Sequence, residues 1–205
     1  MEDLRGRIAV IGWGSLIWDL DDLAPKVEGA WMMRAGPELP FEFSTVSKKR
    51  KMGLAVCIDD EHGAPCPTHA ILSAKSDIHE AAEDLRARER APGIVHIGMI
   101  CARTGARRAR LPAVERAFDA WIEATGAAGA VWTDFASNYD AMRGEAFSLS
   151  RARAYLGALT GENLDEAVRY IENAPATTMT PLRRLLGADP WWRMEAARVR
   201  RLDGV

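Results

Sequence analysis

The 205-residue sequence has few cysteines, little excess charge of either sign and no long apolar run. Its three cysteines are an odd number for a disulfide framework, and a chain of this length can bury enough apolar surface without disulfides. A net charge of −2 argues against a strongly basic nucleic-acid binder. No apolar stretch reaches the roughly 20 residues of a membrane helix, and the N-terminus lacks the apolar core of a signal peptide. We therefore expect a cytoplasmic protein that binds neither nucleic acid nor membrane.

The pattern of apolar residues predicts strands first and helices later. Apolar runs and alternating residues predict strands at 8–11, 41–47, 53–58, 68–73, 93–103 and 130–135. A period of about 3.6 residues predicts helices at 76–91, 111–126, 148–159 and 164–173, and a short one after Thr180. Asn163 is the expected N-cap of the helix at 164–173. This order predicts an α+β fold in a single domain over residues 1–205.

From about residue 139 the expected structure is mainly helical. Three roles remain open for this region, namely a lid, a surface for a homodimer, and simple packing.

A glycine-rich turn, Gly12-Trp13-Gly14-Ser15, follows the first predicted strand. A dinucleotide fingerprint requires a glycine where Ile17 stands, and a nucleophile elbow requires glycines two residues before and after Ser15. A phosphate loop requires a Gly-Lys-Ser or Gly-Lys-Thr sequence, which the chain lacks. Two interpretations remain. The segment is either a plain tight turn or a loop whose consecutive backbone N–H groups bind a carboxylate or an oxyanion.

Glu89 is a charged residue at an apolar position of the helix predicted from residue 76. At 100° per residue it lies about 20° from Ile78 and about 40° from Leu85, so its side chain is expected to point inward. Arg86 and Arg88 are expected on other faces. Burial and the carbonyl end of a helix both favour a protonated carboxyl, which suits a general base that must later return its proton. The alternative is a frayed helix end, with Glu89 solvated or paired with an arginine such as Arg86.

The sequence does not predict a metal site. Cys57, His62, Cys66 and His69 are spaced by five, four and three residues. Structural zinc sites usually hold a pair two to four residues apart on a tight knuckle, whereas Cys57 and His69 fall in predicted strands. His96 stands in an apolar segment and is interpreted as a core histidine. We therefore predict no metal site.

Two segments together resemble the motifs of the γ-glutamylcyclotransferase-like family, in particular its ChaC-type branch. In that family a Tyr-Gly-Ser-Leu-Ile-Trp loop follows the first strand, and an Arg-Glu pair stands near the end of the first long helix. Residues Gly14 to Trp18 of GWGSLIWD match the loop, and Arg88 and Glu89 of LRARERAPG match the pair. The segment FSTVSKKRKMGLAVCID is also similar to a stretch of the family. The resemblance covers residues 7 to 100 well and the rest weakly.

The resemblance implies a small mixed β-barrel flanked by helices, without metal or cofactor. It implies a carbon–nitrogen lyase that takes a small-molecule γ-glutamyl substrate, such as glutathione or a γ-glutamylamine. The substrate's own α-amino nitrogen attacks its γ-carbonyl and releases 5-oxoproline with an amine or a peptide. Glu89 would be the catalytic base and acid. Backbone N–H groups around Gly14, Ser15 and Leu16 would hold the substrate carboxylate or the tetrahedral oxyanion.

The sequence departs from the family at two places near these motifs. Trp13 replaces the loop tyrosine and adds bulk at the mouth of the expected pocket, and Ala91-Pro92-Gly93 replaces the usual Gly-Tyr. The substrate therefore need not be the family's usual one. Tyr139 is a candidate for a second pocket group, as a later tyrosine is in the ChaC-type branch, and the alternative is an aromatic in the core. A non-catalytic small-molecule or partner-binding protein of the same fold is the second functional hypothesis.

Overall fold

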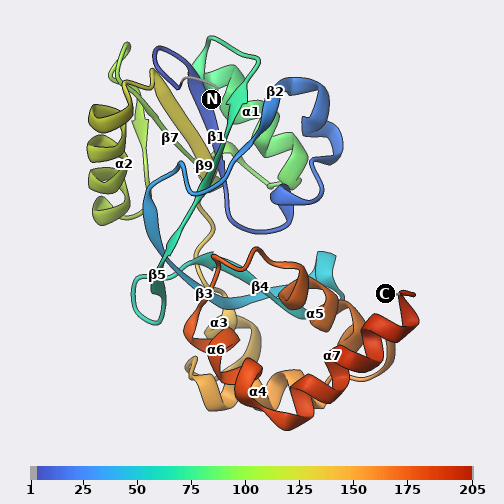
Figure 1. The fold of residues 1–205 in the computed structure, drawn as a ribbon. Helices are drawn as coiled ribbons and strands as arrows, with labels where there is room; N and C mark the ends of the chain where they lie inside the picture. Colours follow the sequence, from blue (N-terminus) through green and yellow to red (C-terminus); the bar gives the residue numbers. More distant parts are fainter. Residues whose placement is uncertain (1–3, 205) are drawn as a thin grey trace. The chain divides into compact units, whose positions relative to one another are not determined.

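A computed structural model of the chain describes residues 4–204 (Figure 1). The chain forms two compact units, each built from two separate stretches of sequence. The first unit contains residues 4–39 and Pro67–Phe135, and the second contains Pro40–Cys66 and residues 136–204. Strands and helices are mixed along the chain, so the predicted α+β class is confirmed. The predicted helical region is also present, because every helix or strand described between residues 139 and 204 is a helix. All of these helices belong to the second unit.

The first unit is built on a six-stranded sheet with strand order β2-β6-β1-β9-β7-β8. Its strands are β1 (Ile8–Gly12), β2 (Val27–Met32), β6 (His69–Ser73), β7 (Ile97–Cys101), β8 (Arg107–Arg108) and β9 (Gly129–Thr133). Strands β1 and β9 are parallel, and the other neighbouring pairs are antiparallel. A barrel requires its first and last strands to pair, and here β2 and the two-residue β8 end the sheet as open edges. The expected closed barrel is therefore wrong.

Two helices cover opposite faces of this sheet. Helix α1 (Ile78–Glu89) packs on the face that carries Val131 of β9, because Val131 and Leu85 belong to one core cluster. The next residue, Trp132, stacks on Phe118 of α2 (Pro112–Thr125) with ring centroids 3.8 Å apart. Successive residues of a strand point to opposite faces, so α1 and α2 lie on different sides of the sheet, as Figure 1 shows. The glycine loop thus follows a strand buried between two helical layers.

Gly98 of β7 offers a test of this packing, because the ring of Trp132 occupies the place of its side chain. An added Cβ would lie 2.0 Å from Cε2 of Trp132. We expect Gly98→Ala to lower the free energy of unfolding by about 1–3 kcal/mol, measured by urea denaturation. Gly187→Ala is the matched control, because its added Cβ meets no atom within 4 Å in helix α6 and alanine favours a helix. Equal stability of the two variants would contradict the close contact.

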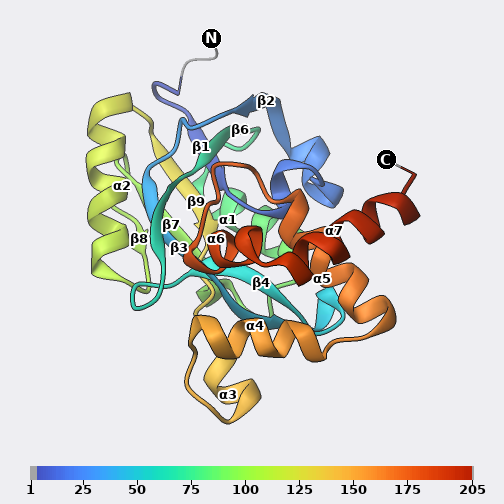
Figure 2. The same cartoon turned by 60° about the horizontal axis from the view of Figure 1, so that its bottom comes forward.

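The second unit combines a three-stranded sheet with five helices (Figure 2). The sheet has the order β4-β3-β5, formed by β3 (Glu38–Ser47), β4 (Gly53–Ile58) and β5 (Ala64–Pro67). The helices are α3 (Tyr139–Arg143), α4 (Leu149–Ala158), α5 (Gly161–Asn173), α6 (Pro181–Ala188) and α7 (Pro190–Leu202). Helix α5 begins three residues earlier than expected, because Thr160 and not Asn163 is its N-cap.

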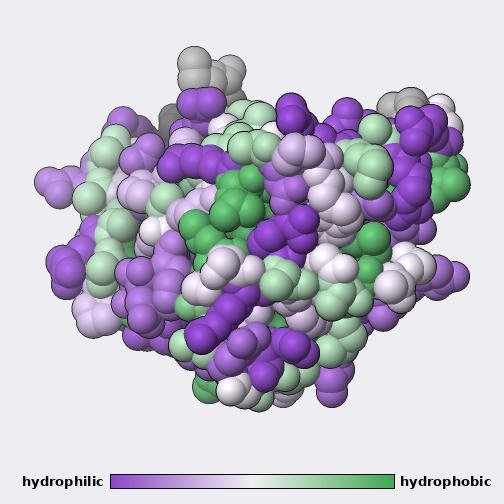
Figure 3. All heavy atoms as spheres, turned by 90° about the horizontal axis from the view of Figure 1, so that it is seen from below, coloured by the Kyte–Doolittle hydropathy of each residue, from purple (hydrophilic) through white to green (hydrophobic). Residues whose placement is uncertain are grey.

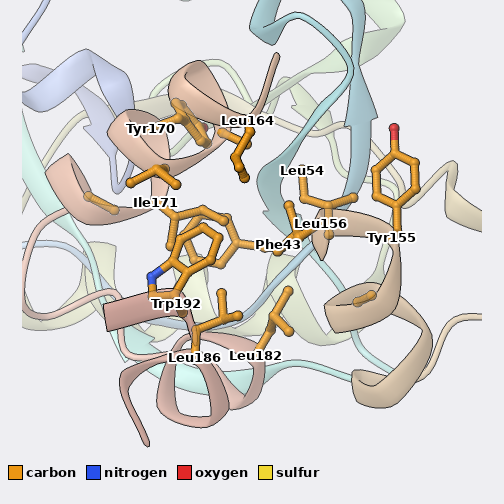
Figure 4. Packing of buried hydrophobic residues seen from close by; sticks show 14 of the residues in the cluster. Phe43, Leu54, Tyr155, Leu156, Leu164, Tyr170, Ile171, Leu182, Leu186 and Trp192 are labelled. Carbon is orange, nitrogen blue, oxygen red and sulfur yellow. The ribbon is translucent and has the colours of Figure 1, made fainter. Parts of the chain in front are cut away.

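The core of the second unit lies between its sheet and its helices (Figure 4). Phe43 and Leu54 come from the sheet, and they share the core with Leu156, Ile171 and Trp192 from three helices. Figure 3 shows hydrophilic side chains spread over an outer face of these helices, with small apolar groups between them. Among the described residues, no helix is both long and apolar enough to cross a membrane.

A buried carboxylate joins the sheet of the second unit to the start of helix α6. Glu42 of β3 is fully buried. Its Oε1 accepts a hydrogen bond from the backbone N–H of Phe43 at 2.7 Å, and its Oε2 accepts one from the N–H of Leu182 at 3.0 Å. The hydroxyl of Thr180 is a third partner. Glu42 therefore satisfies one of the N–H groups that the first turn of α6 leaves without an acceptor inside the helix.

Candidate functional site

The loop after β1 lies at one end of the six-stranded sheet, together with the ends of three neighbouring strands. Gly12, the last residue of β1, pairs with His69, the first residue of β6. Strand β9 runs parallel to β1 and ends there at Thr133, which pairs with Ile97 at the start of β7. We call this end, defined by Gly12, His69, Ile97 and Thr133, the loop end of the sheet.

Helix α1 carries Glu89 to the loop end. The helix starts at the opposite end, because the side chain of Ile78 lies near Gly129, the first residue of β9. Glu89 is its last residue, and β7 begins at the loop end only eight residues later. The topology therefore places Glu89 and the glycine loop at the same end of one sheet.

The helix stops at Glu89 because Arg90 adopts a left-handed conformation with φ 52°. The N–H of Arg90 donates to the carbonyl of Ala87 and the N–H of Ala91 donates to that of Arg86, which satisfies the last turn. The helix thus ends before Pro92, earlier than the sequence pattern predicts.

The side chain of Glu89 is only 18% exposed, so it points largely inward, as predicted. The predicted outward position of Arg88 is wrong, because the Arg88 side chain is fully buried. Glu89 does pair with an arginine, as the alternative interpretation held, but the partner is Arg88 at 3.3 Å. Arg86 pairs with Glu83 at 2.6 Å.

Arg88 connects Glu89 to the segment that follows the glycine loop. Its Nε donates to the carbonyl of Leu20 at 3.2 Å, and its Nη2 donates to the carbonyl of Asp19 at 2.5 Å. Its Nη1 donates to Oε1 of Glu89 at 3.3 Å. These carbonyl acceptors lie 68 and 69 residues away in the sequence, so helical periodicity could not reveal them. One guanidinium therefore holds both the loop segment and the candidate base.

The glycine loop leads into a short 3-10 helix over Ser15–Ile17. Its first hydrogen bond runs from the N–H of Ile17 to the carbonyl of Gly14, so the helix itself does not use the N–H groups of Ser15 and Leu16. Gly14 is the N-cap and has no side chain to bond them. The side chains of Trp13 and Leu16 are buried, with 4% and 5% exposed. At Leu16 the backbone is thus the part suited to contact a substrate.

Tyr139 lies in the core of the second unit. It is fully buried, and its ring packs edge-on against those of Phe147 and Tyr155, with centroids 5.3 and 6.1 Å away. Burial raises the pKa of its hydroxyl. This environment corresponds to the core aromatic that was the alternative interpretation. Tyr139 does not belong to the unit that brings Glu89 and the glycine loop together.

Sequence reasoning did not select Asp134, a second carboxyl at the loop end. Asp134 directly follows β9 and is 3% exposed. Its Oδ2 accepts from the N–H of Arg110 at 2.6 Å, and its own N–H donates to the carbonyl of His96. Burial raises the pKa of this carboxyl. An acidic residue immediately after an apolar strand is the signal that could have identified it.

His69, at the loop end beside Gly12, gives a stability prediction. Its Nδ1 accepts a hydrogen bond from the N–H of Arg34 at 2.8 Å, so the neutral ring carries its proton on Nε2. Burial, and then the charge of Arg34, lower the pKa of His69 below its usual 6.5. A lowered histidine pKa contributes stability that is present above 6.5 and is lost as the pH falls through the folded-state value.

We expect His69→Asn, which keeps an acceptor near Nδ1 but cannot titrate, to lose less stability than the parent between about pH 7.5 and about pH 5. Denaturant unfolding at each pH gives the free energy of unfolding, and its change with pH is the slope to be compared between variants. The exposed His79→Asn should keep the slope of the parent. The same slope in His69→Asn would contradict the assignment.

The residues considered for zinc are divided between the two units. His69 belongs to the first, and Cys57, His62 and Cys66 belong to the second. Over residues 4–204, no three histidine, cysteine, aspartate or glutamate side chains are grouped to hold a metal ion. Among the described residues, the three cysteines are buried and none of them forms a disulfide. His96 stacks on Phe135 with ring centroids 5.1 Å apart.

The resemblance to γ-glutamylcyclotransferases rests on the loop and the Arg-Glu pair in the sequence. Comparisons of the chain with protein-family models, with curated proteins and with solved structures found no match.

Proposed function

We propose that the protein is a cofactor-free γ-glutamylcyclotransferase that acts in the cytoplasm on a small γ-glutamyl peptide or amine. The observation that carries the proposal is the position of Glu89. Its carboxylate is largely buried at the loop end of the sheet, and Arg88 connects it to the segment after the glycine loop. Glutamate side chains are mostly exposed, so the burial of Glu89 at the end of a helix is unusual.

The proposed reaction needs one base and one oxyanion site. Glu89 takes a proton from the substrate's α-ammonium, and the freed nitrogen attacks the γ-carbonyl carbon. The N–H groups of Ser15 and Leu16 stabilise the tetrahedral oxyanion. The bond between that carbon and the leaving nitrogen then breaks, and Glu89 returns its proton to the departing nitrogen. The second surplus proton of the attacking nitrogen passes to the released amine, which leaves as an ammonium. The products are 5-oxoproline and the free amine or peptide, so no external oxidant, reductant or metal is needed for balance.

We also propose that the first unit is related to the γ-glutamylcyclotransferase-like fold, with its sheet open where the family has a barrel. Support comes from the order of the motifs along the chain. The glycine loop follows the first strand, and the Arg-Glu pair ends the first long helix, as in the family.

A substrate panel tests the proposal. Purified protein is incubated with glutathione, a γ-glutamyl dipeptide and a γ-glutamylamine, and 5-oxoproline is measured by mass spectrometry. We expect 5-oxoproline from at least one compound, at a rate that depends on protein concentration. Absence of 5-oxoproline from every compound would overturn the proposal. Binding of a compound without turnover, measured by calorimetry, would favour the non-catalytic alternative.

A further inference from the structure

Arg88 is unusual among the described arginines because its side chain is completely buried. Removing a cation from water is unfavourable unless anions and hydrogen-bond acceptors replace the water. Two backbone carbonyls and the carboxylate of Glu89 are its acceptors, and Oδ2 of Asp19 lies 3.8 Å from Nη2. Asp19 is 53% exposed, so Glu89 is the better shielded of the two counter-charges.

The contacts of Arg88 restrict where the Glu89 carboxylate can lie. A guanidinium is planar, so the bonds from Nε and Nη2 to the two carbonyls also define the direction of Nη1. Nη1 bonds only Oε1 of Glu89, which leaves Oε2 for a substrate nitrogen. An arginine does not release its proton in proteins, so it does not compete with Glu89 in proton transfer.

We infer that Arg88 is a positioning residue, whose guanidinium aligns the Glu89 carboxylate with the segment that follows the glycine loop. The inference rests on the proposed function.

Arg88→Lys tests the inference in the full-length protein. Lysine keeps the charge but is not a planar fork, so it cannot make the same three directed bonds. With the best substrate of the panel, we expect kcat to fall about 10- to 100-fold and KM to change much less. The acidic limb of the pH–rate profile should also move, a change that a merely structural role would not produce. Arg90→Lys is the matched control, because Arg90 is the next arginine along the chain and its side chain is 68% exposed.

Three results are distinguishable. A parent that releases no 5-oxoproline from any compound overturns the proposed function, and with it a catalytic role for Arg88. An active parent with an unchanged kcat and pH profile in Arg88→Lys overturns the inference alone. A lowered kcat with a moved acidic limb, and an unaffected Arg90→Lys, supports it.

A second measurement needs no substitution of Arg88, in case Arg88→Lys does not fold. The side-chain N–H signals of Arg88 are compared by NMR in the parent and in Glu89→Gln. We expect these signals to shift in Glu89→Gln and to stay in place in Glu83→Gln, because Glu83 bonds Arg86 instead. Unshifted Arg88 signals in Glu89→Gln would show that the two side chains are not coupled and would overturn the inference.

Discussion

Replacement of Glu89 by glutamine is expected to lower kcat for 5-oxoproline formation by about 10²- to 10⁴-fold, the usual contribution of a general acid–base group. Glutamine has nearly the same shape, and its amide oxygen can still accept the bond that Nη1 of Arg88 donates to Oε1. It cannot take the proton of the substrate's ammonium. The fold should therefore persist while the reaction stops, and single-substrate kinetics with mass-spectrometric detection of 5-oxoproline measures the change.

Glu83→Gln is the matched control for this experiment. Glu83 lies on the same helix, its side chain is 54% exposed, and it pairs with Arg86. We expect this variant to keep the parent rate and the parent thermal midpoint. If Glu89→Gln were as active as Glu83→Gln, Glu89 would not be the base and the proposed mechanism would be wrong.

The largest expected effect on stability belongs to Glu42 of the second unit. Glu42→Ala would leave the N–H groups of Phe43 and Leu182 and the hydroxyl of Thr180 without their buried acceptor. Each buried donor left unsatisfied costs about 1–3 kcal/mol. We therefore expect the free energy of unfolding to fall by about 3–5 kcal/mol, measured by urea denaturation with the linear extrapolation.

Glu61→Ala provides the comparison for Glu42→Ala, because the Glu61 side chain is 82% exposed. Its stability should stay within about 0.5 kcal/mol of the parent. A loss of less than about 1 kcal/mol in Glu42→Ala would mean that Glu42 does not hold the start of α6.

The raised pKa of Glu42 predicts that the free energy of unfolding depends on pH. Burial raises the pKa of Glu42 above its usual 4.5, although the bonds from Thr180, Phe43 and Leu182 oppose the shift. With a raised folded-state pKa, the unfolded chain loses its proton first, so stability falls as the pH rises from 4.5 to the folded-state value. This part of the pH dependence should be absent from Glu42→Ala.

Local patterns were sufficient to find the elements with strong periodicity. Strands β1, β4 and β9 and helices α1 and α2 lie close to their predicted ranges. The strands are short apolar runs, and the buried residues of the helices recur at helical spacing. The pattern missed β2, an edge strand that is largely exposed and contains Gly29 at a left-handed φ of 74°. It also missed α7, whose buried residues Trp192, Ala196 and Val199 are separated by arginines.

The sequence alone indicated the α+β class, the glycine loop and the inward direction of Glu89. These properties depend on the conformation of neighbouring residues along one strand or one helix, which local spacing describes. Only the tertiary structure showed the open sheet, the buried Arg88 and the cap that Glu42 provides for α6. The acceptors of Arg88 lie 68 and 69 residues away, and Leu182 lies 140 residues from Glu42. A buried charge is stabilised by the groups that folding brings to it, and sequence spacing does not encode which groups those are.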